Sequence, residues 1–201
     1  CGKHEGGKVE YGILKETTIP PIKNPKELKS KSINMAKALV KFDKSEKILQ
    51  KELMNIYSDP HPDIDVYVND SNIYFWKIIF NGPDGTPYKN GSWLAYMEFS
   101  ESYPFVPPNI RFVTPIKHCN INNYGRVCHS ILDRNYTPNV KILLLLQCIY
   151  GLLLNPDVTD PLDTNLALSY YDANGQYEAQ IMEYVNKYAK KSREEWKIEL
   201  S

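Results

Sequence analysis

The sequence predicts a single α+β domain, because helical and strand-like segments lie in separate runs along the chain instead of alternating. Three observations support this fold class. A helical pattern comes first, four short β-prone segments with short connections follow, and further helical segments come last. We assign residues 43–201 to this domain. Residues 1–42 are interpreted as a partly flexible N-terminal extension, since Gly and Lys are frequent and no clear period organises them.

The first helix of the domain is expected to begin at Asp43. Asp43 and Glu46 have the spacing of a capping box, in which two side chains bind backbone N–H groups at the helix start. The apolar residues at helical spacing are Ile48, Leu49, Leu53, Ile56 and Tyr57. Pro60 ends the helix, because proline lacks the backbone N–H that a helix needs. A short amphipathic helix is also expected at residues 31–42.

Four strands are then expected, in segments rich in aromatic and β-branched residues. Their ranges are 64–68, 74–80, 93–99 and 109–113. The connections are short and rich in Gly, Pro and Asn, so an antiparallel meander is the natural pairing. Residues 114–139 form a long irregular stretch, which in a compact domain is usually functional.

Helical patterns resume after this stretch. We expect helices at residues 140–154 and 164–171, and one long amphipathic helix over residues 176–196. We see no internal repeat.

Composition narrows the function classes. The 201 residues carry 24 Lys and Arg against 24 Asp and Glu, so the formal net charge is zero and a nucleic-acid partner is not favoured. No apolar stretch is long enough to cross a bilayer, so no membrane partner is expected. The four cysteines are Cys1, Cys119, Cys128 and Cys148. A chain of this size does not need disulfides, and we expect reduced thiols and a cytoplasmic or nuclear protein.

The segment from His118 to Pro138 is the most informative part of the chain. It holds His118-Cys119-Asn120, then Gly125-Arg126-Val127-Cys128, and it follows a Tyr-Pro-Phe-Val-Pro-Pro block at residues 103–108. Together these segments resemble the core of the ubiquitin-conjugating enzyme family. Other matching landmarks, in order, are Gly82-Pro83, Pro87-Tyr88, Phe112-Val113-Thr114, Asn155-Pro156 and Asp160-Pro161-Leu162. Each is weak alone, but their joint order and spacing is a specific signal.

Three positions depart from the family pattern. Cys119 stands where the family usually has proline, His129 where it has leucine, and Tyr136 where it has tryptophan. These changes concern the detailed geometry of the loop and the choice of ligase more than the class of reaction.

The resemblance implies that Cys128 is the nucleophile that carries a modifier as a thioester, since a thiolate can accept an acyl group and pass it on. The alternative is a buried structural thiol. Asn120 would stabilise the oxyanion during transfer, or it would only brace the loop through its backbone contacts. The sequence does not separate these two roles. His118 is expected to have a structural role in the active site.

Asp160 is a third candidate, because the family often has an acidic residue before the Pro-Leu pair. A carboxylate here could orient the incoming lysine and help to remove its proton. The alternative for Asp160 is a helix N-cap or turn residue.

The resemblance also implies partners. They are an activating enzyme, ubiquitin or a ubiquitin-like modifier, and a RING- or HECT-type ligase that contacts Phe105 and Pro138 with Lys47 and Lys51 nearby. No cofactor is expected, because ATP is used by the separate activating enzyme. A different class of function is a non-catalytic module that uses the same fold to bind ubiquitin or a ligase.

A zinc site is the rival interpretation of His118-Cys119 and Cys128-His129. Zinc ligands usually come in pairs separated by two to four residues, whereas both of these pairs are adjacent. The spacing therefore favours no metal site.

Overall fold

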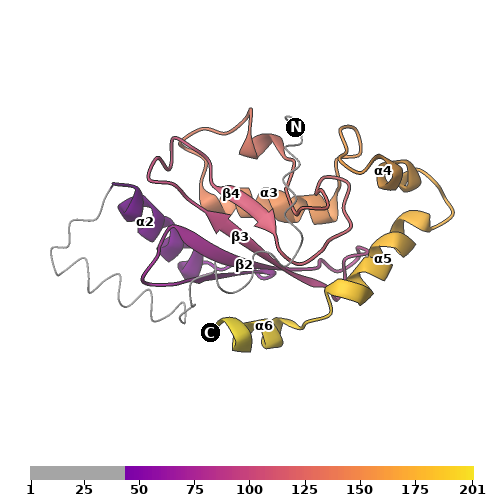
Figure 1. The fold of residues 1–201 in the computed structure, drawn as a ribbon, viewed down its shortest axis with the longest axis horizontal. Helices are drawn as coiled ribbons and strands as arrows, with labels where there is room; N and C mark the ends of the chain where they lie inside the picture. The colour runs from indigo at the N-terminus through magenta and orange to yellow at the C-terminus, as the bar shows by residue number, and fades with distance from the viewer. Residues whose placement is uncertain (1–43) are drawn as a thin grey trace.

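The computed structural model describes residues 44–201 (Figure 1). Asp43 and the whole N-terminal extension, including the helix expected at residues 31–42, therefore lie outside the described residues. The elements are α2 (Lys44–Ser58), β1 (Ile64–Val68), β2 (Phe75–Asn81), β3 (Ser92–Glu98), β4 (Asn109–Phe112), the short 3-10 helix η2 (Ser130–Leu132), α3 (Ile142–Leu154), α4 (Thr164–Tyr170), α5 (Gln176–Tyr188) and α6 (Arg193–Leu200). No helix in this part of the chain has both the length and the apolar character needed to span a membrane.

The four strands form one antiparallel sheet in the order β1-β2-β3-β4. The predicted α+β fold with a four-stranded meander is confirmed, and the strand ends shift by about one residue. Alternation along β2 sends Trp76, Ile78 and Phe80 into the main core, while Ile79 faces the opposite side of the sheet.

Helices α2, α3 and α5 contribute buried apolar side chains to one core, which they share with the sheet. The stripe on α2 is as the sequence predicts, with Leu49, Leu53 and Ile56 buried. A buried carboxylate, Glu52, joins α2 to two other segments. It accepts hydrogen bonds from the Tyr103 hydroxyl and from the Ile142 backbone N–H, each at 2.7 Å. Glu52 thus caps α3 from another helix and holds the proline-rich loop beside both helices.

The C-terminal region differs from the sequence prediction. One helix was expected over residues 176–196, but α5 ends at Tyr188 and α6 begins at Arg193. The cause is a capping box between Ser192 and Glu195, which starts a new helix. The break lets α6 turn back across the sheet, on the opposite side from α3 (Figure 1).

Helix α6 covers a second, smaller apolar cluster. Trp196 and Leu200 pack there against residues of β1, β2 and β3, namely Tyr67, Ile79 and Leu94. The Trp196 indole N–H donates to the Ser92 hydroxyl at 2.8 Å, and Arg193 binds both carboxylate oxygens of Asp65. The periodicity of residues 176–196 did not reveal this second face, because both helices are amphipathic and the four linking residues include no proline or glycine.

Candidate active site

The irregular stretch after β4 is held against the sheet by backbone contacts. Gly125 has φ +81°, and its carbonyl accepts the N–H of Phe112 in β4 at 2.8 Å. A Cβ at Gly125 would lie 2.0 Å from the Phe112 carbonyl oxygen, so only glycine fits this close approach. The Cys128 N–H then donates to the Asn120 carbonyl at 2.8 Å, which places these two candidate residues side by side.

His118 is buried and uses both ring nitrogens. Its Nδ1 accepts the Asn120 backbone N–H at 2.8 Å, so the proton of the neutral ring is on Nε2, which donates to the Leu152 carbonyl at 2.7 Å. Burial lowers the pKa of His118 to about 4. The ring is therefore neutral near pH 7, and its contacts are those of a residue that ties the loop to α3.

Asn120 is also buried, and its side chain binds one backbone segment in both directions. Its Nδ2 donates to the Asp157 carbonyl at 2.7 Å, and its Oδ1 accepts the Asp157 N–H at 2.9 Å. The amide thus braces the loop that follows α3. One of its two N–H groups is used in this contact, which leaves the other for a further acceptor.

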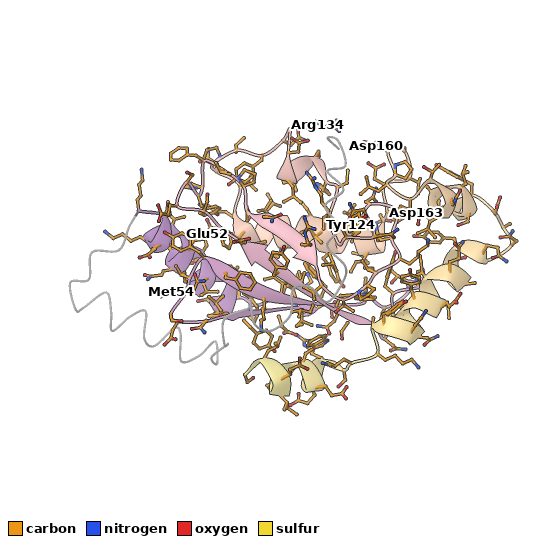
Figure 2. The ribbon with its side chains drawn as sticks, in the orientation of Figure 1. Glu52, Met54, Tyr124, Arg134, Asp160 and Asp163 are labelled. Atoms are coloured by element: carbon orange, nitrogen blue, oxygen red, sulfur yellow. The ribbon has the colours of Figure 1, made fainter. Side chains whose placement is uncertain are left out.

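Cys128 is half-buried and lines a small cavity of about 100 Å³. Asn120 and Asp160 line the same cavity, so the structure brings the three candidate catalytic residues together. Figure 2 shows Asp160 near Arg134 at one edge of the molecule, on neighbouring loops. A larger cavity of about 250 Å³ is also lined by Cys128, together with residues of β4 and η2.

Asp160 is exposed, and its segment is fixed by the next residues. The N–H groups of Leu162 and Asp163 both donate to the Cys119 carbonyl, at 2.7 and 3.2 Å. The N-cap of α4 is Asp163, whose carboxylate accepts the Leu166 N–H. The capping role that the sequence left open for Asp160 therefore belongs to Asp163.

Sequence reasoning missed Asp157. Its backbone holds the Asn120 amide, and its carboxylate lines the cavity with Cys128. Hydrogen bonds from the Thr159 hydroxyl and N–H lower the pKa of Asp157. The Asp-Val-Thr order is a common turn signal that could have marked this position.

The rival zinc interpretation gains no support from this geometry. Both ring nitrogens of His118 are used in hydrogen bonds, and Cys119 is buried with its pKa raised to about 11 by burial. Across residues 44–201, no cluster of three or more His, Cys, Asp or Glu side chains could hold a metal ion.

The candidate ligase surface lies where three segments meet. The Tyr136 hydroxyl donates to the Pro104 carbonyl at 2.7 Å, which joins the turn before Pro138 to the proline-rich loop. Ser45 of α2 donates to the Tyr103 carbonyl at 2.7 Å. The surface itself is open. Phe105 is 69% exposed, and Pro138, Lys47 and Lys51 are exposed as well.

This chain is similar to proteins of one known family. The family model "Ubiquitin-conjugating enzyme" matches residues 48–185. The chain belongs to the ubiquitin-conjugating enzyme family. A protein of Saccharomyces cerevisiae named "Ubiquitin-conjugating enzyme E2 13" is 33% identical over 72% of this chain and 94% of its own length. The resemblance found in the sequence is thereby confirmed, and with it the reaction class, a transferase.

A second relative is much longer. The "Probable bifunctional E2/E3 enzyme R795" of Acanthamoeba polyphaga mimivirus is 65% identical over 95% of this chain, and the chain spans only 15% of that protein's length. Among solved structures, a Plasmodium yoelii protein described as a ubiquitin-conjugating enzyme has a TM-score of 0.68 and 32% identity, covering 75% of this chain and 98% of that one.

Proposed function

We propose that this ubiquitin-conjugating domain accepts ubiquitin, or a ubiquitin-like modifier, from an activating enzyme as a thioester on Cys128. It then passes the modifier to a substrate lysine or to a ligase cysteine. The observation that carries this proposal is the grouping of Cys128, Asn120 and Asp160 around one cavity at the end of a braced loop. When a lysine amine attacks the thioester, a group that can accept its proton must lie close to the amine.

The roles of the other residues follow from their contacts. The second N–H of the Asn120 amide supports a role at the oxyanion, while its first N–H braces the Asp157 segment. The exposed carboxylate of Asp160 would help to orient the lysine. The corner formed by Phe105, Pro138 and α2 would receive a RING- or HECT-type ligase. We place the enzyme in the cytoplasm or nucleus, where thiols stay reduced.

The test is a loading reaction with activating enzyme, ATP and modifier, read on a non-reducing gel. The parent chain and Cys148→Ala should form an adduct that a thiol reductant removes. Cys148 is a matched control, because it is also partly buried and lies in α3, away from the candidate residues. Cys128→Ala should form no adduct, and Cys128→Ser should form an oxygen ester that resists reductant but not alkali.

Two results would contradict the proposal. Loading of Cys128→Ala at the parent level would move the reaction to another cysteine. A parent chain that binds modifier or ligase without loading would favour the second class, a non-catalytic binding module. Running the assay with several modifiers also identifies the cargo.

A further inference from the structure

His129 follows Cys128 and occupies a position that the site described so far does not use. Its side chain is half-buried and lines both the 100 Å³ and the 250 Å³ cavities that flank Cys128. The imidazole therefore stands at the boundary between the two spaces from which an acyl group on Cys128 could be reached. In the sequence, His129 stood out as a departure from the family's usual leucine and as part of the rival zinc interpretation.

The ring is oriented by one hydrogen bond. Nδ1 accepts the Ile131 backbone N–H at 3.0 Å, so His129 is the N-cap of η2. Because Nδ1 is an acceptor, the neutral ring carries its proton on Nε2. Within residues 44–201, Nε2 makes no hydrogen bond to another group. The ring thus offers one unused N–H donor beside Cys128.

The His129 ring is neutral near pH 7. Burial lowers the pKa of His129, and the Asp157 carboxylate opposes this shift only in part. The other charged side chains that line the shared cavity are Asp133, Arg134 and Asp160. A neutral imidazole with a fixed Nε2–H is suited to donate a hydrogen bond, and poorly suited to take a proton through the same atom.

We propose that His129 is a catalytic residue whose Nε2–H stabilises the oxyanion formed on the Cys128 thioester during transfer. This inference rests on the proposed function. In the step, the nitrogen lone pair of a lysine amine attacks the thioester carbonyl carbon, and the C=O electron pair moves to oxygen. Collapse restores C=O, breaks the C–Sγ bond and leaves Cys128 as a thiolate. The proton of the amine passes to water or to a carboxylate such as Asp160.

Asn120 alone can offer few donors to the oxyanion. The Asn120 side chain commits one N–H and its carbonyl oxygen to the Asp157 backbone, so at most one amide N–H remains for the oxyanion. Fixed donors in a site shielded from water contribute strongly to acyl transfer. A second donor on the residue next to the nucleophile would share this role.

The alternative is that His129 only caps η2. Three substitutions separate the two roles. His129→Asn keeps a side-chain oxygen close to the position of Nδ1, so it retains the cap but loses the distant donor. His129→Gln places its amide nitrogen close to the position of Nε2, so it retains the donor but weakens the cap. His129→Leu removes both and introduces the family's usual residue.

The experiment uses the full 201-residue chain, with a thermal unfolding scan, endpoint loading and single-turnover discharge to free lysine for each variant. Endpoint loading first brings each variant to the thioester form, so that discharge is compared between equal amounts of loaded enzyme. The discharge rate should fall on the order of 10- to 100-fold in His129→Leu and His129→Asn. This loss is at the lower end of, or below, the effect of removing one oxyanion-hole donor. His129→Gln should discharge within about threefold of the parent even if its unfolding temperature falls, since a retained donor keeps most of this stabilisation.

A pH series distinguishes a donor from a base. If Nε2–H is a donor, the ratio of the parent rate to the His129→Gln rate stays constant from about pH 6 to 9, because Nε2 carries a proton whether the ring is neutral or protonated. Protonation of the nearby carboxylates and of the attacking amine changes both rates alike, so it cancels in this ratio. A ratio that falls toward acid pH would show that the ring acts as a base, and the inference would be wrong.

The outcomes are separable from those of the proposed function. If the parent chain does not load at all, the thioester proposal fails first. If every variant loads and His129→Asn or His129→Leu discharges at the parent rate, only the role of His129 is overturned. Slow discharge in His129→Gln with an intact fold would also overturn it.

Discussion

Two short segments of the active loop, residues 118–120 and residues 128–130, lie side by side but have different environments. Residues 118–120 are buried, and the polar groups of His118 and Asn120 bond to α3 and to the Asp157 segment. Residues 128–130 are only half-buried, and Cys128 and His129 face cavities. One backbone bond, from the Cys128 N–H to the Asn120 carbonyl, joins the two segments.

This difference suggests that residues 118–120 position the site and that residues 128–130 take part in the reaction. A buried segment whose side chains bond to other elements cannot easily rearrange, so it fixes the place of its neighbours. A half-buried segment beside a cavity can admit a substrate group. Asn120 belongs to both, because its contacts are internal while its side chain also lines the cavity with Cys128. Its substitution is therefore the sharpest test of the comparison.

We expect Asn120→Ala to have the largest effect on rate. Loss of an oxyanion donor should slow discharge to free lysine about 100-fold, whereas loading should change far less. The bracing role predicts a further loss of about 1–3 kcal/mol in the free energy of unfolding, because the Asp157 backbone groups lose their partners. Single-turnover discharge and urea unfolding measure the two effects.

Thr159→Ala is the matched control for bracing. It removes a hydroxyl that holds the Asp157 carboxylate and loosens that segment without touching the Asn120 amide. Slow discharge in Asn120→Ala with normal discharge in Thr159→Ala would support a direct role. If discharge slows equally in both variants, Asn120 acts only by holding the Asp157 segment in place.

The pH dependence of stability tests the buried segment, residues 118–120, through His118. The unfolded chain binds a proton at His118 near pH 6.5, while the folded chain resists it down to about pH 4. Stability from this group is complete above about pH 6.5 and falls as the pH drops toward 4, with a total on the order of 3 kcal/mol. We expect His118→Gln, which keeps a donor for the Leu152 carbonyl, to be less stable at pH 7.5.

Urea midpoints at pH 7.5 and 5.0 check this prediction. The stability difference between the parent and His118→Gln should narrow at the lower pH, since glutamine does not titrate. A constant difference would mean that the folded ring accepts a proton readily, and the segment would not be as closed as its contacts imply.

The sequence predicted the larger features of the molecule and missed those that depend on distant contacts. Strong apolar periodicity and turn residues located α2, the meander and α3. The break before α6 was missed because a local capping box at Ser192 outweighed a continuous apolar stripe. The site motif predicted Cys128, Asn120 and Asp160 as candidate residues, and the structure places all three around one cavity. Asp157 was not found, since its role comes from a bond to Asn120 across the fold.

The same contrast between a buried and an open residue occurs in the proline-rich loop. Tyr103 is 2% exposed and bonds to Glu52, whereas Phe105 is 69% exposed. An exposed aromatic residue between prolines is a good candidate for a ligase contact. We expect Phe105→Ala to load normally and to lose about 2 kcal/mol of ligase binding. The measurement is ligase-stimulated discharge and affinity with a cognate ligase found by screening.

Lys44→Ala is the control for that surface, because Lys44 is also exposed on α2 but is not among the candidate ligase residues. It should bind the ligase nearly as well as the parent. If Phe105→Ala binds and responds like the parent, the ligase docks elsewhere, and Phe105 only packs on its own loop.

The smallest expected effect concerns Asp160, the exposed member of the site. Asp160→Asn should slow discharge about three- to tenfold at pH 7, because an exposed carboxylate gives only part of the benefit of a buried base. The deficit should shrink as the pH rises toward ~10.4, since a growing fraction of the lysine amine is then already deprotonated. Asp133→Asn removes the same charge from the rim of the same cavity and serves as control. Equal slowing by both variants would assign the effect to overall charge, and a deficit in Asp160→Asn that does not change with pH would remove Asp160 from proton transfer.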